Sequence, residues 1–360
     1  MPRDERTYAE IDVDSVLFNL DFFKAKNPGK KIFAVMKADS YGHGDILCKY
    51  IEHKIDGLCS ATIEEGIRLR QFSDKPILIL GYIPVRMYHA LIEYNLTPSV
   101  YSCESATLLN EYFSSVNSSI AVHLKINTGM NRMGIRYSDF LTLSRVFSLD
   151  RLKITGIYSH LASNDDIEFT RLQKQRFLSC VQYCNELTDG IEFIHIANSA
   201  DSALGSDIGN AVRVGYGMYG YGDPSLKNAL SWKARVIKTD YLKENETIGY
   251  GRTFRTFKPL TKTAVLSVGY GDGYPRNLPG KRFVLYKGMK LPILGRICMD
   301  MTVIDVSDAD INPGDYVTLL GTSEGITVSA ENLGFGYEVL CDISKRVKRV
   351  YLKENTYISE

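Results

Sequence analysis

Short apolar runs recur through the first two thirds of the sequence, with helix-like segments between them. Eight runs are present, at residues 31–38, 56–62, 76–82, 96–102, 119–127, 152–161, 191–198 and 210–220. Most of them are continuously apolar, which is typical of strands that are buried on both faces of a parallel sheet. Eight strands that alternate with helices predict an α/β fold, a (β/α)8 barrel of the TIM type.

The pattern changes near Leu230. From there to the end, short alternating strands are separated by Gly, Pro and Asp turns, and few helical patterns appear. This pattern predicts a second, mainly β domain. We therefore expect a barrel over residues 1–229 and a mainly β domain over residues 230–360, and the chain is long enough for both.

Charge and hydropathy exclude several classes of function. The net charge of +1 gives no reason to expect a nucleic-acid or membrane-surface partner. No apolar run is long enough for a transmembrane helix, and the charged N-terminus does not read as a signal peptide. Seven scattered cysteines without a Cys-x-x-Cys pair predict reduced thiols and no metal site. We expect a cytoplasmic protein, and a cytoplasmic domain of a membrane-anchored parent stays open as an alternative.

Polar residues gather where the apolar runs end. They are Lys37, Tyr41, Lys125, Arg132, His160, Asn198, Ser199 and Arg213. In barrels of this type the chemistry takes place at the C-terminal ends of the strands. The clustering therefore predicts an active site at that end of the barrel. His195 also lies near a strand end, but a single histidine there is more often a hydrogen-bonded core residue.

Lys37 follows the apolar stretch IFAVM directly. A buried ammonium group is unfavourable unless it is paired or neutral, and a neutral lysine is a nucleophile toward aldehydes. The alternative is a side chain that reaches from the strand end to water. The position alone does not decide between the two.

Residues 215–220 read GYGMYG and match the pattern G-x-G-x-x-G. Turn residues follow instead of a helix, which argues against a nicotinamide dinucleotide site. A phosphate cradle remains open, because glycines let backbone N–H groups approach an anion closely. Arg213 precedes this loop inside an apolar strand, so it needs either a structural partner or an acceptor on a bound ring.

Tyr250 and Tyr270 lie in glycine-rich connections of the second domain. A tyrosine that acts as a base needs a phenol pKa lowered toward neutrality by nearby positive charge. Arg252 and Arg276 are near enough in sequence to supply such a charge.

Eight segments, taken together and in order, resemble the alanine racemase family of pyridoxal 5′-phosphate enzymes. They are AVMKADSYGHG, KINTGMNRMGI, HIANSADSAL, VRVGYGMYG, IGYGRTF, SVGYGDGYPR, GRICMDMTVIDV and GYEVLCDIS. The resemblance covers nearly the whole chain. It implies a barrel followed by a β domain, a homodimer with shared active sites, and interconversion of L- and D-alanine, L- and D-serine or both. It also implies a role in supplying D-amino acids for peptidoglycan precursors.

The resemblance assigns the catalytic roles to two residues. Lys37 would form the Schiff base with the cofactor and act as the base on one face of the substrate. Tyr250, contributed by a second subunit, would be the base on the opposite face. Racemisation needs a proton removed from one face and returned to the other, so two opposed bases are sufficient.

The resemblance also implies which residues bind the cofactor and the substrate. Arg213 would contact the pyridine nitrogen, and His160 would hydrogen-bond to Arg213. The remaining cofactor-binding residues would be Tyr41, Arg132, Asn198, Ser199, Gly215, Tyr216 and Tyr337. The substrate would meet Arg132, Met299, Asp300 and Tyr270, with Arg276 at the entrance. Lys125 lies where many members carry a carbamylated lysine.

The sequence departs from the family pattern at Asn127, Tyr216 and Gly271, where an aspartate, an apolar residue and an alanine are usual. Such changes favour serine, as in serine racemase domains of the glycopeptide-resistance type, whereas Tyr337 favours alanine. The choice between the two substrates stays open. A decarboxylase of the same architecture is disfavoured by Arg213, and a non-catalytic cofactor carrier by the second domain. A structural barrel with an inert lysine is the remaining alternative.

Overall fold

The computed structural model describes residues 4–277, 280 and 282–358, which form two units. The barrel unit takes Ser15–Ser40 and Asp45–Lys227. The β unit takes the residues before Ser15, the short segment Tyr41–Gly44 and the chain from Asn228 onward.

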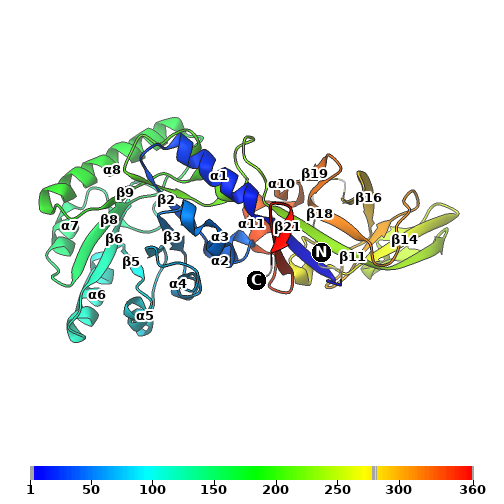
Figure 1. Cartoon of the computed structure of the whole chain (residues 1–360), viewed down its shortest axis with the longest axis horizontal. Coiled ribbons are helices and arrows are strands. Elements are labelled where there is room, and N and C mark those ends of the chain that lie inside the picture. Colours follow the sequence, from blue (N-terminus) through cyan, green and yellow to red (C-terminus); the bar gives the residue numbers. More distant parts are fainter. Residues whose placement is uncertain (1–3, 278–279, 281, 359–360) are drawn as a thin grey trace. The chain divides into compact units, whose positions relative to one another are not determined.

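The barrel unit contains the eight predicted strands in sequence order (Figure 1). Their bounds are β2 (Lys31–Val35), β3 (Gly57–Ser60), β4 (Ile77–Ile79), β5 (Thr97–Val100), β6 (Ile120–Asn127), β8 (Leu152–Tyr158), β9 (Phe193–His195) and β10 (Ala211–Val214). They pair in parallel in the order β10-β2-β3-β4-β5-β6-β8-β9, and a short β7 (Ile135–Arg136) adds to β6. Asn210 N–H donates to Ile194 O at 3.0 Å across the last gap, so the barrel is nearly closed. The predicted fold class is confirmed.

Glycines make room for large side chains in the barrel interior. A Cβ on Gly57 would lie 2.4 Å from the Phe33 ring, and one on Gly156 would lie 2.5 Å from the His123 ring. The Phe33 ring in turn stacks on the His195 ring with centroids 5.6 Å apart. Aromatic rings and imidazoles therefore fill the space that smaller aliphatic side chains would leave open.

Helices follow the strands and lie outside them in the barrel unit (Figure 1). The longer ones are α1 (Val13–Lys26), α4 (Ile63–Arg70), α6 (Cys103–Ser115), α7 (Phe140–Phe147) and α8 (Ile167–Leu187), and the shorter ones are α2 (Lys37–Tyr41), α3 (Leu47–Ile51), α5 (Tyr88–Glu93) and α9 (Ser199–Ala203). Thr62 and Ser102 begin α4 and α6 with reciprocal capping boxes. These caps satisfy backbone N–H groups that a helix start leaves unpaired.

The β unit is mainly β, as predicted. One ten-stranded sheet has the order β19-β18-β15-β16-β17-β14-β11-β1-β20-β21. The bounds are β1 (Thr7–Asp12), β11 (Leu230–Lys243), β14 (Leu260–Leu266), β15 (Phe283–Tyr286), β16 (Met289–Leu294), β17 (Thr302–Asp305), β18 (Tyr316–Ser323), β19 (Ile326–Val328), β20 (Lys348–Lys353) and β21 (Thr356–Ile358). A hairpin of β12 (Thr247–Ile248) and β13 (Phe254–Arg255) and two short helices, α10 (Ala330–Leu333) and α11 (Gly336–Cys341), complete it.

The N-terminal strand belongs to the β unit, although the expected division at residues 229 and 230 assigns it to the barrel. Strand β1 pairs antiparallel with β11 and parallel with β20. The buried Trp232 donates its Nε1–H to Thr7 Oγ1 at 2.8 Å, which ties β1 to β11 further. The division itself stays a prediction about domains. Within the described part of the chain, no helix has the length and apolar character needed to cross a bilayer.

Candidate active site

The short segment α2, which begins at Lys37 after strand β2, is a left-handed turn and not a right-handed helix. The next four residues, Ala38 to Tyr41, have φ angles of 53°, 53°, 55° and 51°. Each non-glycine residue in this conformation costs about 1–2 kcal/mol, so surrounding contacts must stabilise the turn. One such contact is the Ala38 N–H, which donates to Glu65 Oε1 at 2.7 Å. Glu65 is also the capping-box residue of α4, so a barrel helix fixes the backbone beside Lys37.

The barrel unit brings several predicted site residues together at the C-terminal ends of its strands. Arg213 Nη2 lies 3.3 Å from His160 Nδ1. Lys125 Nζ and the Arg213 guanidinium carbon each lie 5.3 Å from the centre of the Tyr158 ring. Strands β6, β8 and β10 therefore deliver their polar residues to one place, as parallel strands of a barrel do.

This cluster is strongly cationic. Burial, together with the positive charges of Arg132, Arg213 and Lys37, lowers the pKa of Lys125 to about 8. Within the described residues, Lys125, Arg132 and Arg213 form no ion pair with an aspartate or glutamate. The strand ends therefore suit an anionic ligand.

Arg213 is buried, and its terminal nitrogens are fully occupied. Nη1 donates to His195 Nδ1 at 2.5 Å and to the His195 carbonyl at 3.1 Å. Nη2 donates to the carbonyls of Ser159 at 2.6 Å and Ile196 at 3.1 Å. Among the hydrogen bonds of the described residues, none uses Nε, which leaves one N–H for a ligand.

The Arg213 contacts determine how two buried histidines are protonated. A guanidinium only donates, so His195 Nδ1 must accept and His195 Nε2 must carry the proton. His195 Nε2 lies 3.0 Å from His123 Nδ1, which therefore accepts in turn. Burial lowers the pKa of His123 to about 3 and that of His195 well below its ordinary value, with the Arg213 charge acting in the same direction. Burial also lowers the pKa of His160 to about 3, so all three rings are neutral at pH 7.

The glycine-rich loop after β10 packs against the start of α9. Ser199 Oγ accepts from the backbone N–H of Gly215 at 3.0 Å and of Gly217 at 3.2 Å. Asn198 caps α9 with its side chain, and Tyr216 begins a single turn of 3₁₀ helix. Asn198, Ser199, Gly215 and Tyr216, four of the expected cofactor-binding residues, are therefore neighbours in the barrel unit, and the Ser199 hydroxyl joins α9 to the loop.

The other predicted site residues lie in the β unit. Tyr41 and Tyr337 have ring centroids 6.1 Å apart. Tyr250 is 71% exposed in a glycine-flanked 3₁₀ turn. The guanidinium carbon of Arg276 lies 5.7 Å from the Tyr270 ring centre.

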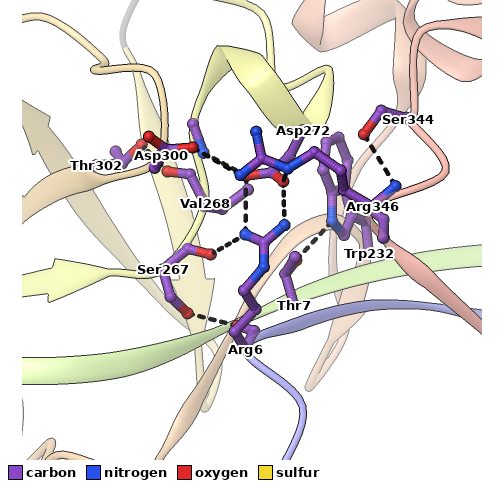
Figure 2. A network of polar contacts seen from close by, with 12 residues as sticks. Arg6, Thr7, Trp232, Ser267, Val268, Asp272, Asp300, Thr302, Ser344 and Arg346 are labelled. Carbon is purple, nitrogen blue, oxygen red and sulfur yellow. Dashed lines mark hydrogen bonds and ion pairs between the residues drawn. The ribbon is translucent and has the colours of Figure 1, made fainter.

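Met299 and Asp300 lie between β16 and β17, and Asp300 belongs to a charged network that the sequence analysis did not identify (Figure 2). Arg346 Nη2 lies 2.6 Å from Asp300 Oδ1, and Arg346 Nε lies 3.4 Å from Asp272 Oδ1. Arg6 forms a bidentate pair with the same Asp272 carboxylate. The available signal was the aspartate inside the glycine-rich stretch at residues 269–273. His123 was missed as well, and its signal was a histidine inside an apolar run.

Comparisons with known proteins agree with this architecture. Residues 11–223 match the model of the alanine racemase N-terminal domain, and residues 229–351 match that of the C-terminal domain. The alanine racemase of Clostridium tetani is 37% identical over 375 residues, covering 98% of this chain and 96% of that protein. That of Aquifex aeolicus is 36% identical, covering 96% and 99%.

Solved structures show the same likeness. The alanine racemase of Clostridium difficile 630 superposes with a TM-score of 0.92 at 33% identity and covers 99% of this chain and 98% of its own. The enzyme from Bacillus anthracis with bound L-Ala-P superposes with a TM-score of 0.92 at 28% identity, covering 100% and 98%. Both halves of the chain, the order of its strands and its curated relatives lead to one conclusion. The chain belongs to the alanine racemase family and is a racemase.

Proposed function

We propose that this racemase interconverts L- and D-alanine with Lys37 and Tyr250 as its two bases. The observation that carries the proposal is the cationic cluster at the strand ends, where the positive charges of Arg132, Arg213 and Lys37 act on Lys125. Alanine is the substrate named for the relatives to which the chain is similar. We further propose that the product serves peptidoglycan precursors.

The cofactor of the family, pyridoxal 5′-phosphate, fits the residues present. Its phosphate needs donors and positive charge, and its ring nitrogen needs one donor, which the Nε–H of Arg213 would supply. We propose that it is held by Lys37, Tyr41, Arg132, His160, Asn198, Ser199, Arg213, Gly215, Tyr216 and Tyr337. When bound, it supplies the electron sink that acidifies the Cα hydrogen of an amino acid.

The protein residues then divide the proton transfers between them. Lys37 holds or removes a proton on one face of Cα, and Tyr250 does so on the other face. Arg213 keeps its own proton, so it leaves a contacted ring nitrogen unprotonated, and the neutral His195 and His160 do not supply one. This limits electron withdrawal and favours rapid return of the proton to Cα over side reactions.

The substrate and the second subunit complete the proposed site. We propose that Arg132, Met299, Asp300 and Tyr270 meet the amino acid, with Arg276 at the entrance. We also propose that Tyr250, Met299 and Asp300 serve the active site of the partner in a homodimer. The lowered pKa of Lys125 leaves a fraction of neutral amine, which is the form that reacts with carbon dioxide, so we propose that Lys125 is carbamylated. The carbamate would then be an anion, and the cluster would stay cationic through Arg132 and Arg213. Seven free cysteines support a cytoplasmic location.

The deciding experiment measures racemisation of alanine beside serine by the purified, cofactor-loaded protein. We expect faster loss of optical activity with alanine, accompanied by exchange of the Cα hydrogen for solvent deuterium. Lys37→Ala should abolish both signals. Exchange without racemisation would contradict the two-base proposal, release of carbon dioxide would indicate a decarboxylase, and faster turnover of serine would reverse the substrate assignment.

A further inference from the structure

Asp272 is a fully buried carboxylate that holds two arginines in the β unit (Figure 2). Its Oδ2 accepts from the Gly269 N–H at 3.0 Å and from Arg6 Nη1 at 3.1 Å. Its Oδ1 accepts from Arg6 Nη2 and lies 3.4 Å from Arg346 Nε. Arg6 is fixed further by the Ser267 carbonyl at 3.0 Å. A buried carboxylate with this many donors holds its partners firmly in place.

Arg346 carries this fixed geometry outward to Asp300. Its Nη2 donates to Asp300 Oδ1 at 2.6 Å, and the two side chains are 47% and 51% exposed. Two exposed side chains usually form a weak pair, because holding both in one geometry loses conformational entropy. Here Arg346 is already held by Asp272, so that loss is smaller. The loop of Asp300 is also tied to the same region, since the Gly271 N–H donates to the Met299 carbonyl at 2.8 Å.

Gly271 has no side chain and therefore leaves room for the Arg346 guanidinium. A Cβ at this position would lie 2.6 Å from Arg346 Nη1 and 3.1 Å from the Met299 carbonyl. A side chain at this position would therefore force the guanidinium or the Met299 loop to move. The contact of Arg346 with Asp300 is thus linked to the absence of a side chain at residue 271.

The ion pair between Arg346 and Asp300 affects the charge that a substrate would meet. Arg6 already offsets the charge of Asp272, so Arg346 is available to offset that of Asp300. An amino-acid substrate carries a carboxylate, which the negative charge of an unpaired Asp300 would repel. An Asp300 side chain whose charge is offset by Arg346 would not repel the substrate.

We propose that Arg346 is a positioning residue of the active site, which fixes the orientation of Asp300 and offsets its charge for the substrate. This inference rests on the proposed function, because it takes Asp300 to lie at the substrate. The proposal adds four residues to the set that determines substrate affinity: Arg6, Gly271, Asp272 and Arg346.

The first test is a double-mutant cycle on the holoenzyme with alanine as substrate. Arg346→Gln should raise KM about tenfold and change kcat less than about threefold, because ground-state and transition-state binding weaken together. Arg346→Lys should restore part of the loss, since it keeps the charge without the fork. Asp300→Asn combined with Arg346→Gln should raise KM no more than the worse single variant.

Arg171→Gln provides a matched control. Arg171 also pairs with a carboxylate, Glu168, at 2.7 Å, but on the exposed surface of α8. Its removal should leave KM unchanged. Additive effects of the Arg346 and Asp300 substitutions, or a fall in kcat alone, would overturn the proposal.

The second test does not depend on activity. The carboxyl carbon of Asp300 is followed by ¹³C NMR in protein labelled at aspartate, with Asp300→Asn to assign the signal. Arg346→Gln should change the chemical shift of this carboxyl signal, whereas the control Arg171→Gln should leave it in place. An unchanged chemical shift in Arg346→Gln would refute the pairing, whereas a wild-type protein that racemises neither alanine nor serine would refute the proposed function alone. If Arg346→Gln does not fold, Gly271→Ala takes its place, and no change in either measurement would reject the proposal.

Discussion

At the scale of single residues, Arg213 determines the chemistry around it through the direction of its hydrogen bonds. It donates to His195, which donates to His123, and both imidazoles are buried and neutral. A chain with one fixed direction keeps the Arg213 guanidinium in place and leaves its Nε–H for a ligand. The sequence suggested a site role for Arg213 and a hydrogen-bonded core role for His195, but it did not show that the two side chains are hydrogen-bonded to each other.

Acidification should therefore destabilise the fold. The pKa of His123 falls from 6.5 to about 3 on folding, so between these values the unfolded chain binds more protons than the folded chain. The contribution of a buried, neutral histidine to the free energy of unfolding is fully present above pH 6.5. It should fall by about 1.4 kcal/mol per pH unit for each such histidine as the pH drops. Denaturant unfolding at pH 7.5, 6 and 5 measures this. His123→Gln should reduce the slope by one proton, and an identical slope in both proteins would contradict the assignment.

At the scale of elements, the turn after β2 is the most unusual feature of the barrel unit. Four consecutive non-glycine residues adopt left-handed angles directly after Lys37. The sequence placed Lys37 at the end of a strand, but not in this turn, because only Asp39 of ADSY is of a residue type that is enriched in the left-handed region. The contact with Glu65 comes from a helix 27 residues away, so tertiary structure fixes the turn.

Ala38→Gly tests this strain. Ala38 is exposed and contributes only a methyl group, so glycine should relieve the backbone and stabilise the protein by about 0.5–1 kcal/mol. Ala200→Gly is the matched control, because Ala200 is exposed in the right-handed helix α9. It should destabilise by about 0.5–1 kcal/mol. Equal losses of unfolding free energy in the two variants would contradict a strained turn.

At the scale of the whole molecule, the two proposed bases lie in different units. Lys37 lies in the barrel unit, and Tyr250 lies in the β unit on an exposed turn. An exposed tyrosine that acts as a base needs a partner surface to surround it, which agrees with the proposed sharing of sites between two subunits.

Subunit mixing tests that sharing. Lys37→Ala and Tyr250→Phe homodimers should both be inactive, whereas a mixed dimer has one site with both bases intact. Random exchange of equal amounts should restore about a quarter of wild-type activity, because half of the dimers are mixed and each has one working site. Separately tagged chains confirm the exchange, and no recovery after confirmed exchange would show that each chain supplies both bases itself.

The sequence by itself determined the barrel, the mainly β second part and the family. Buried parallel strands have a local, repeated pattern of apolar residues. Eight motifs in a fixed order are specific for one family. It also located Lys37 and Arg213, since a charge at the end of an apolar run or within one is unusual at the level of a few residues. These features depend on neighbours along the chain.

Only the tertiary structure decided which distant residues support them. The pairing of β1 with β11, the contact of Glu65 with the turn after Lys37, and the network from Arg6 to Asp300 all join segments far apart in sequence. Burial lowers the pKa of His123, and the ion pair with the buried Asp272 holds Arg346. The energies of hydrogen bonds and charge interactions depend on the distance between atoms in three dimensions. The separation of two residues along the sequence does not give this distance.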